Sequence, residues 1–267
     1  VGSWVAGVNR VEKSIYAAYM HAIEQSKYYI YIENQFFISE CSTGVVKNRV
    51  ADALFWRIER AFRADECFRV FVVLPLMPGF EGEYGANSGS AIRAITHWNY
   101  RSISHGPNSL IGRISALGCD PLSYISFCSL RNWAQLNERL VTEMIYVHSK
   151  LMIVDDRLAI CGSANLNDRS LSGNRDSELA LYIEDAEFTL GMMNGHAVQA
   201  GKFAYSLRCR LMKEHLGNLF CDSQHLADMR DPICDKFYKD VWLATAAKNT
   251  IIYEKVFNCI PSDKVQD

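Results

Sequence analysis

The residues best suited to chemistry lie in one stretch of the chain, between residues 144 and 168. His148 and Lys150 are two positions apart, so in an extended strand their side chains share a face, about 7 Å apart along the chain. An imidazole can act as a nucleophile or as a general acid and base, and a lysine beside it can hold a phosphate. The full pattern is H-x-K-x4-D-x6-G-S-x-N, formed by His148, Lys150, Asp155, Gly162, Ser163 and Asn165.

The acidic break at 155–157 predicts the turn of an antiparallel hairpin. It separates two apolar runs, 151–154 and 158–161. Asp155 within it is expected to be a turn residue and a hydrogen-bond acceptor. If the hairpin is centred near Asp156, residues whose numbers sum to about 312 face each other across the two strands.

This register brings hydrogen-bond donors beside the imidazole of His148. The predicted partner of His148 across the hairpin is Ala164, which lies between Ser163 and Asn165. A hydroxyl, an amide and the backbone N–H groups of Gly162 and Ser163 would then converge on one place. Such a group of donors predicts an oxyanion site.

A carboxylate is expected to orient His148. The apolar run 179–183 predicts another strand beside the hairpin, and Glu178 lies immediately before it. A hydrogen bond from His148 to Glu178 would fix the tautomer of the imidazole and favour the imidazolium that a general acid requires. Asp176 is the competing candidate, because the sequence does not anchor the register of this strand.

An ordinary structural histidine is the alternative interpretation of His148. The chain has seven histidines, and only His148 has a lysine two positions later and precedes a Gly-Ser-x-Asn turn. This comparison within the chain favours a functional histidine.

The surrounding elements predict an α/β fold. Twice, a segment with helical spacing of apolar residues leads into an apolar run typical of a strand: 12–26 into 28–32, and 45–64 into 70–74. Such strands predict a mainly parallel central sheet covered by helices on both faces. The Pro- and Gly-rich segment 77–90 predicts a loop, either a plain connection or a lid. Further helices are expected at 91–101, 109–117, 191–216 and 232–253, and a further strand at 124–130.

Composition argues against several other classes of protein. The chain has 267 residues, with 28 Lys and Arg, 30 Asp and Glu and a formal net charge of −2, which argues against nucleic-acid binding. No apolar stretch approaches the roughly 18 residues of a membrane span. The nine cysteines form no CxxC pair, which is typical of reduced thiols in a cytosolic chain and argues against zinc. We also expect no catalytic metal and no cofactor, because no set of carboxylates or histidines has metal-ligand spacing.

The motif resembles that of the phospholipase D superfamily, and specifically the eukaryotic phosphatidylcholine-hydrolysing phospholipase D of the PX/PH type. The resemblance covers almost the whole chain and points to the second half of that enzyme's catalytic region. The segments that carry it are 30–38 (IYIENQFFI), 78–82 (PGFEG), 162–165 (GSAN), 167–170 (NDRS) and 235–237 (DKF).

The resemblance implies an active site shared by two halves. In that family two HxKxxxxD motifs, one in each half of a pseudo-twofold α/β sandwich, meet at a single site. Residues 1–267 would be one phospholipase D-like half-domain with the second motif, and the first half would be absent. The chain begins with Val rather than Met, so we expect a fragment, and we expect it to be inactive unless a partner supplies the other motif.

The resemblance also implies the reaction, which is hydrolysis of phosphatidylcholine to phosphatidic acid and choline through a phosphohistidine, with transfer to alcohols. His148 would be the acid and base. The substrate-binding residues that we expect are Tyr31, Glu33, Gln35 and Gly162. Tyr31 has two interpretations: it fills the core, which is favoured, or its ring meets the choline cation.

The resemblance also implies partners. They are a phospholipid membrane surface, the missing first half and, through other regions of a full-length protein, phosphoinositides and small GTPases. From the reduced thiols and the lack of a membrane span we expect a cytoplasmic protein that binds peripherally to the cytoplasmic face of membranes, and from the near-neutral charge we expect no binding of nucleic acid.

Two other functions stay open. One is a homodimeric phosphodiesterase or nuclease of the same superfamily built around a single motif, against which the near-neutral charge argues. The other is a non-catalytic fragment or scaffold, against which the intact His148, Lys150, Asp155 and Asn165 argue.

Overall fold

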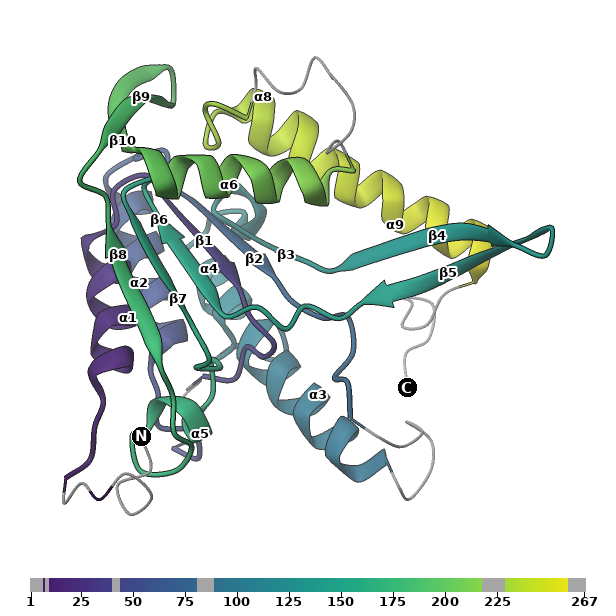
Figure 1. The fold of residues 1–267 in the computed structure, drawn as a ribbon, viewed down its shortest axis with the longest axis horizontal. Helices are drawn as coiled ribbons and strands as arrows, with labels where there is room; N and C mark the ends of the chain where they lie inside the picture. The colour runs from purple at the N-terminus through teal and green to yellow at the C-terminus, as the bar shows by residue number, and fades with distance from the viewer. Residues whose placement is uncertain (1–6, 8–9, 40–43, 81–88, 218–228, 259–267) are drawn as a thin grey trace.

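A six-stranded sheet forms the centre of the computed structural model, with the strand order β3-β2-β1-β6-β7-β8 (Figure 1). The structure describes residues 7, 10–39, 44–80, 89–217 and 229–258. Residues 81–88 of the loop expected at 77–90 lie outside this part of the chain. The strands are β1 (Tyr29–Glu33), β2 (Arg69–Val73), β3 (Ile125–Cys128), β6 (Leu151–Val154), β7 (Leu158–Gly162) and β8 (Ala180–Glu184).

The direction of the strands divides the sheet into two parts. β1, β2 and β3 pair in parallel, whereas β6, β7 and β8 add to them in antiparallel order. The predicted α/β fold is confirmed, but the prediction of a mainly parallel sheet is wrong. β6 and β7 are joined by a tight turn, which can only connect antiparallel neighbours, whereas helices connect β1 to β2 and β2 to β3.

Helices cover one face of the sheet, and the first apolar core lies between these helices and the strands (Figure 1). The inward faces of α1 and α2 pack on alternate strand residues such as Ile30, Val70 and Met152. The two predicted helix-then-strand units are confirmed, although the second helix begins later than expected. The helices on this side are α1 (Ser14–Gln25), α2 (Val50–Arg63) and α4 (Leu110–Ala116), and α3 (Ser90–Ile103) packs on α4.

The other face carries a second core, formed with the C-terminal helices. Tyr31, Phe71 and Ile153 point to this side and meet α6 and the helical segments after residue 229. Since both faces are covered, β1 and β2 are buried along their whole length. The elements on this side are α6 (Lys202–His215), α8 (Asp235–Phe237), the π-helical turn η3 (Tyr238–Leu243) and α9 (Ala244–Phe257).

Two hairpins add to the strands predicted from the sequence. The first part of the helix expected at 191–216 is a hairpin of β9 (Phe188–Met193) and β10 (His196–Gly201). Its turn is Asn194-Gly195, with φ values of 51° and 78°, the Asn-Gly combination that favours a two-residue hairpin turn. The helical prediction for residues 191–201 is therefore wrong.

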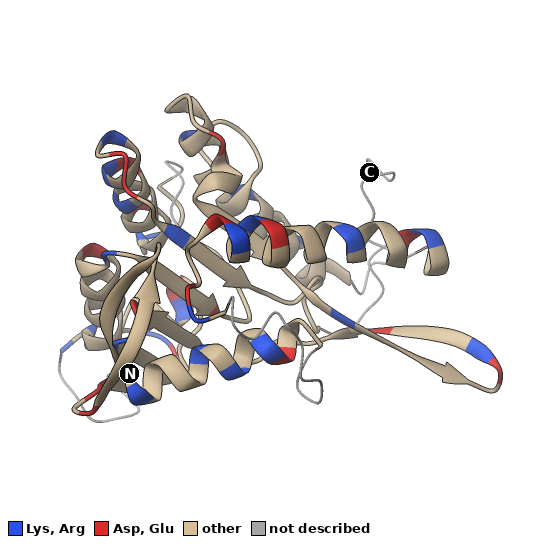
Figure 2. Ribbon diagram, turned by 90° about the horizontal axis from the view of Figure 1, so that it is seen from above, with Lys and Arg blue, Asp and Glu red and all other residues tan. Residues whose placement is uncertain are grey.

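The second hairpin, β4 (Leu130–Leu136) with β5 (Arg139–Ile145), leads from β3 to the motif. It extends away from the sheet (Figures 1 and 2). Trp133, Leu136 and Leu140 on it are each more than half exposed.

An ion pair with no solvent exposure ties α6 to the turn between β6 and β7. Arg208 donates to the Asp156 carboxylate from Nε at 2.9 Å and from Nη2 at 2.6 Å, and both side chains are 0% exposed. The Tyr29 hydroxyl donates to the same carboxylate at 2.7 Å. This network fixes the distal end of the hairpin that carries the motif. In the described ranges, none of the helices has the length and apolar character that a membrane crossing needs.

Candidate active site

The β6–β7 hairpin positions the motif as the sequence predicted. Leu151 pairs with Cys161 and Val154 with Leu158, so paired residue numbers sum to 312. The turn is Asp155-Asp156, and both residues have positive φ values, 55° and 52°. His148 and Lys150 therefore immediately precede β6, and Ser163 and Asn165 immediately follow β7.

Asp155 is confirmed as a turn residue and hydrogen-bond acceptor. Its carboxylate accepts the backbone N–H groups of Lys27, Tyr28 and Tyr29 at 2.7, 2.8 and 2.8 Å. Burial raises the pKa of this carboxyl, although the three N–H groups and Arg57 oppose the rise. Asp155 lies seven positions after His148 in an extended segment, a distance on the order of 20 Å. Asp155 therefore fastens β6 to the start of β1 and does not lie with the other candidate catalytic residues.

His148 is exposed and lies against Tyr146. The two rings stack with centroids 6.1 Å apart and planes 25° apart. Gln35 donates from Nε2 to the Tyr146 hydroxyl at 2.8 Å, and a Cβ on Gly79 would lie 2.7 Å from the same ring. Gln35 thus reaches the site through Tyr146. Sequence reasoning missed Tyr146, although its position two residues before His148 was the available signal.

Lys150 is buried, with 6% of its surface exposed. Its ammonium donates to the backbone carbonyl of His148 at 2.7 Å. Desolvation lowers the pKa of Lys150, and the nearby Glu178 carboxylate opposes this shift. A charged donor therefore contacts the backbone that carries the imidazole.

Glu178 and Asp176 have different partners. Glu178 accepts hydrogen bonds from the hydroxyls of Ser163 and of Ser170, the second at 2.5 Å. Asp176 forms a two-point ion pair with Arg169, at 2.9 and 3.0 Å. Among the residues that the structure describes, neither carboxylate hydrogen-bonds to the His148 ring. Glu178 is therefore the carboxylate that contacts a residue of the motif, Ser163.

The predicted oxyanion site made of backbone N–H groups is wrong. The N–H of Gly162 donates to the Lys150 carbonyl at 3.1 Å, and the N–H of Ser163 donates to the Leu179 carbonyl at 3.0 Å. Both groups are used in strand pairing. Gly162 also has a packing role, since a Cβ there would lie 2.3 Å from the Leu179 carbonyl oxygen. The donors left for a substrate are the side chains of His148, Lys150 and Asn165.

Asn34 ties the end of β1 to the segment that contains Asn165. The Asn34 side-chain oxygen accepts the N–H groups of Leu166 at 3.1 Å and Phe36 at 3.3 Å, which ties the end of β1 to the segment after β7. The Asn165 amide oxygen and the Asn34 amide nitrogen are buried without a hydrogen-bond partner in the described part of the chain. Sequence reasoning did not single out Asn34, although it lies in the segment 30–38.

Tyr31 and Glu33 are buried on the α6 side of the sheet. Tyr31 is 0% exposed, in agreement with the favoured interpretation as a core residue. Its hydroxyl donates to Glu33 at 2.5 Å, and His215 Nε2 lies 2.8 Å from the same carboxylate. The Ser149 hydroxyl donates to the other oxygen of Glu33. Neither Ser149 nor His215 had been identified as a site residue from the sequence.

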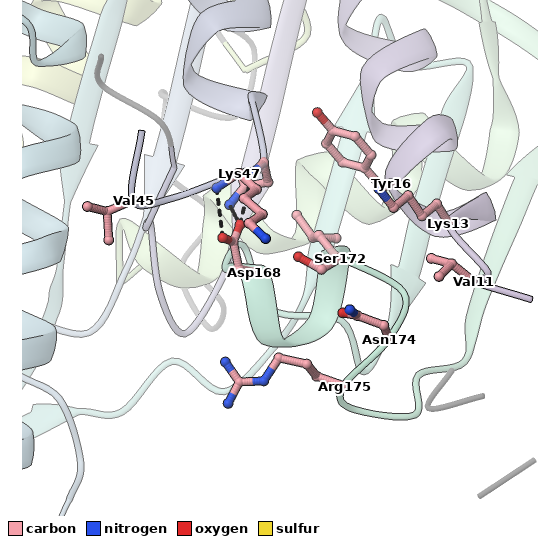
Figure 3. A pocket seen from close by; sticks show the side chains of 11 residues that line it. Val11, Lys13, Tyr16, Val45, Lys47, Asp168, Ser172, Asn174 and Arg175 are labelled. Carbon is pink, nitrogen blue, oxygen red and sulfur yellow. Dashed lines mark hydrogen bonds between the residues drawn. The ribbon is translucent and has the colours of Figure 1, made fainter. Parts of the chain in front are cut away.

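A cavity of about 350 Å³ lies beside α5 (Asp168–Leu171), but the motif residues do not line it (Figure 3). Lys13, Lys47 and Arg175 contribute to its wall. The Asp168 carboxylate in the wall accepts the N–H of Lys47 at 2.7 Å and of Asn48 at 2.8 Å. Within residues 7, 10–39, 44–80, 89–217 and 229–258, no group of three or more His, Cys, Asp or Glu is arranged to hold a metal ion.

Comparison with known sequences gives one consistent result. The family profile described as phospholipase D matches residues 5–142 and 126–248. Human phospholipase D1 is 51% identical over 265 residues, which are 99% of this chain and 24% of that protein. Phospholipase D zeta 2 of Arabidopsis thaliana is 48% identical over 270 residues, which are 100% of this chain and 26% of that protein. Phospholipase D2 of Bos taurus is 48% identical over 265 residues, which are 98% of this chain and 28% of that protein.

Two solved structures are more distant. NucT from Helicobacter pylori has a TM-score of 0.37 and 15% identity, covering 65% of this chain and 80% of its own. Nuc from Salmonella typhimurium, a phospholipase D family member, has the same TM-score and identity and covers 76% of this chain and 86% of its own. The chain spans about a quarter of the length of the three sequence relatives.

Proposed function

Because the chain belongs to the phospholipase D family, we propose that it supplies one of the two active-site histidines of a phospholipase D that hydrolyses phosphatidylcholine. The observation that supports this best is the exposed His148 beside the buried ammonium of Lys150, with Asn165 following the paired strand. The rest of a longer protein would provide the other motif, since the relatives are about four times as long.

In the proposed reaction a histidine of the other half attacks phosphorus, and the bond from phosphorus to the choline oxygen breaks. His148 gives its proton to that oxygen, so choline leaves as a neutral alcohol group with its quaternary ammonium unchanged. His148 then takes a proton from water or an alcohol, whose oxygen displaces the phosphohistidine nitrogen. Division into two displacements lowers the barrier of each.

The residues of this chain supply charge stabilisation for both steps. Lys150 and the Asn165 amide can donate to the phosphoryl oxygens as negative charge develops on them. Glu178 reaches the substrate region through Ser163. The proposed role of Glu178 is to keep the ammonium of Lys150 charged, which agrees with its effect on the pKa of that group.

The choline contact that we propose is Tyr146 rather than Tyr31. Tyr31 has no exposed surface, whereas Tyr146 is 38% exposed and stacks on His148. A quaternary ammonium is attracted to the face of an aromatic ring. A leaving choline beside His148 would therefore have the ring of Tyr146 close to it.

The proposed setting is the cytoplasmic face of a membrane, with phosphoinositides and small GTPases acting through other regions of the full-length protein. A nuclease is less well supported. Acidic and basic residues are interspersed along the helices (Figure 2), and the formal net charge is −2.

The test is choline release from phosphatidylcholine vesicles by the full-length parent, with a chelator and a primary alcohol present. We expect turnover and a phosphatidyl-alcohol product, both reduced at least about a hundredfold in His148→Ala and in Lys150→Ala, since positioned acid–base groups contribute 10² to 10⁴. Equal turnover by folded parent and variants would overturn the assignment of these residues. If none of them acts on the vesicles while a model phosphodiester or nucleic acid is cleaved, the lipid substrate is wrong.

A further inference from the structure

Ser149 connects the two motif residues to the buried side of the sheet. It lies between His148 and Lys150, and its hydroxyl donates to Glu33. Glu33 pairs with Leu151 on β6, so the side chains of Ser149, Leu151 and Glu33 follow one face. Lys150 follows the opposite face with Met152, which belongs to the first core.

Glu33 is held by three donors from different parts of the chain. Besides Ser149, the Tyr31 hydroxyl and His215 Nε2 contact its carboxylate, at 2.5 and 2.8 Å. The side chains of Glu33 and His215 are only 7% and 9% exposed. Both oxygens of the Glu33 carboxylate are thus occupied by donors of the protein, and Glu33 is assigned no contact with a substrate.

His215 connects this cluster to α6. It is the last residue of α6, and Arg208 on the same helix binds Asp156 at the turn after β6. The two residues are seven positions apart, about 10 Å along the helix. Helix α6 is therefore fastened near both ends of β6, to the turn by Arg208 and to the motif end by His215.

A purely structural role does not account for the composition of this cluster. An apolar core would fill the same space without burying a carboxylate and an imidazole, whose desolvation is costly. Ser149 itself is exposed, and Glu33 is the partner that ties its side chain to the folded interior. What the cluster holds is the backbone that carries the imidazole and the ammonium.

We propose that Glu33 and His215 are positioning residues, which act through the Ser149 hydroxyl to fix the backbone between His148 and Lys150 in the geometry of the reaction. This inference rests on the proposed function. Neither residue touches the substrate. Misplacement of reacting groups by about 1 Å is enough to lower a rate about a hundredfold.

The experiment uses the full-length parent with Glu33→Gln, His215→Leu and Ser149→Ala. We expect kcat for choline release to fall about tenfold to a hundredfold, with KM changed less than about threefold. His215→Gln keeps an N–H donor toward Glu33 and should recover most of kcat. In the double variant Glu33→Gln with Ser149→Ala, the loss should equal the larger single loss, because both remove one connection.

Met212→Ala is the matched control for stability. Met212 is on α6, is 0% exposed and lies in the same core as Tyr31. We expect it to lower the midpoint of thermal unfolding as much as His215→Leu does, with kcat unchanged at a temperature where both are folded. An equal fall of kcat in Met212→Ala would overturn the proposal, because the effect would be one of stability alone.

The outcomes also separate this inference from the proposed function. If His148→Ala abolishes turnover while Glu33→Gln and His215→Leu keep the kcat of the parent, the positioning role is wrong and the catalytic assignment stands. If His148→Ala turns over like the parent, the proposed function itself is wrong, and the positioning role is overturned with it.

Discussion

The Lys150 ammonium donates a 2.7 Å hydrogen bond to the backbone carbonyl of His148. This bond ties the Lys150 side chain to the backbone of His148 before any substrate is present. Lys150 is 6% exposed and forms no ion pair with a carboxylate in the described part of the chain. Under the proposed function, this charge stabilises the phosphoryl oxygens.

The first prediction concerns the protonation of Lys150. Burial lowers its pKa below the ordinary 10.5, while Glu178 opposes the shift. The protonated fraction should fall as pH rises through this lowered pKa, and Glu178→Gln should lower the pKa further. Between the lowered pKa and 10.5 the unfolded chain binds more protons, so this residue makes the free energy of unfolding rise with pH.

Competitive amine labelling of the full-length parent across pH, read by mass spectrometry, measures this pKa. The peptide that contains Lys150 should become reactive at lower pH in Glu178→Gln than in the parent. The Lys150→Arg variant identifies the signal by removing it. A later onset of labelling in Glu178→Gln would contradict the placement of the two residues.

A second prediction assigns Asp155 to stability. Asp155→Asn leaves an amide group facing backbone N–H donors, which should lower the free energy of unfolding by about 1–3 kcal/mol. Urea unfolding measures the loss, and activity should follow the folded fraction. Asp65→Asn is the matched control, because Asp65 has a similar positive φ of 52° but is exposed. Equal effects of the two substitutions would show that the hydrogen bonds of Asp155 contribute nothing to the free energy of unfolding.

The sequence was informative wherever a local pattern determined the structure. The apolar runs on both sides of Asp155-Asp156 predicted the hairpin and its register, which the pairing confirms. The turn Asn194-Gly195 was an equally clear signal. The apolar spacing of residues 191–216 favours a helix over the whole range, and this pattern conceals the turn.

Contacts between distant segments could not be predicted in this way. Glu33 and His215 are 182 residues apart, and neither has a local pattern that identifies the other. The N–H of Gly162 bonds to Lys150 across the predicted hairpin and the N–H of Ser163 bonds to Leu179 on its other side, so strand pairing occupies both groups. Sequence reasoning placed these groups correctly and did not foresee that strand neighbours would bind them.

A third prediction concerns the buried ion pair of Arg208 and Asp156. Arg208→Met leaves the Asp156 carboxylate buried without its cation, which should lower the free energy of unfolding by about 3–5 kcal/mol. Adding Asp156→Asn removes the uncompensated charge and should restore part of the loss. Chemical denaturation of the single and double variants measures both effects. A double variant less stable than Arg208→Met would contradict this explanation, because the loss would then come from packing.

The last prediction tests the headgroup contact at Tyr146 and rests on the proposed function. Tyr146→Ala should reduce the preference for phosphatidylcholine over a lipid with a primary amine headgroup by about threefold to thirtyfold, the range of a cation–π contact. Tyr146→Phe keeps the aromatic face and should keep the preference, although it loses the hydrogen bond from Gln35.

The ratio of kcat/KM values for the two lipids is the measurement, because general damage to the stacking of Tyr146 on His148 lowers both values together. Trp133→Ala removes an exposed aromatic ring from the β4–β5 hairpin and should leave the ratio unchanged. A changed ratio in Trp133→Ala, or an unchanged one in Tyr146→Ala, would place the choline contact elsewhere.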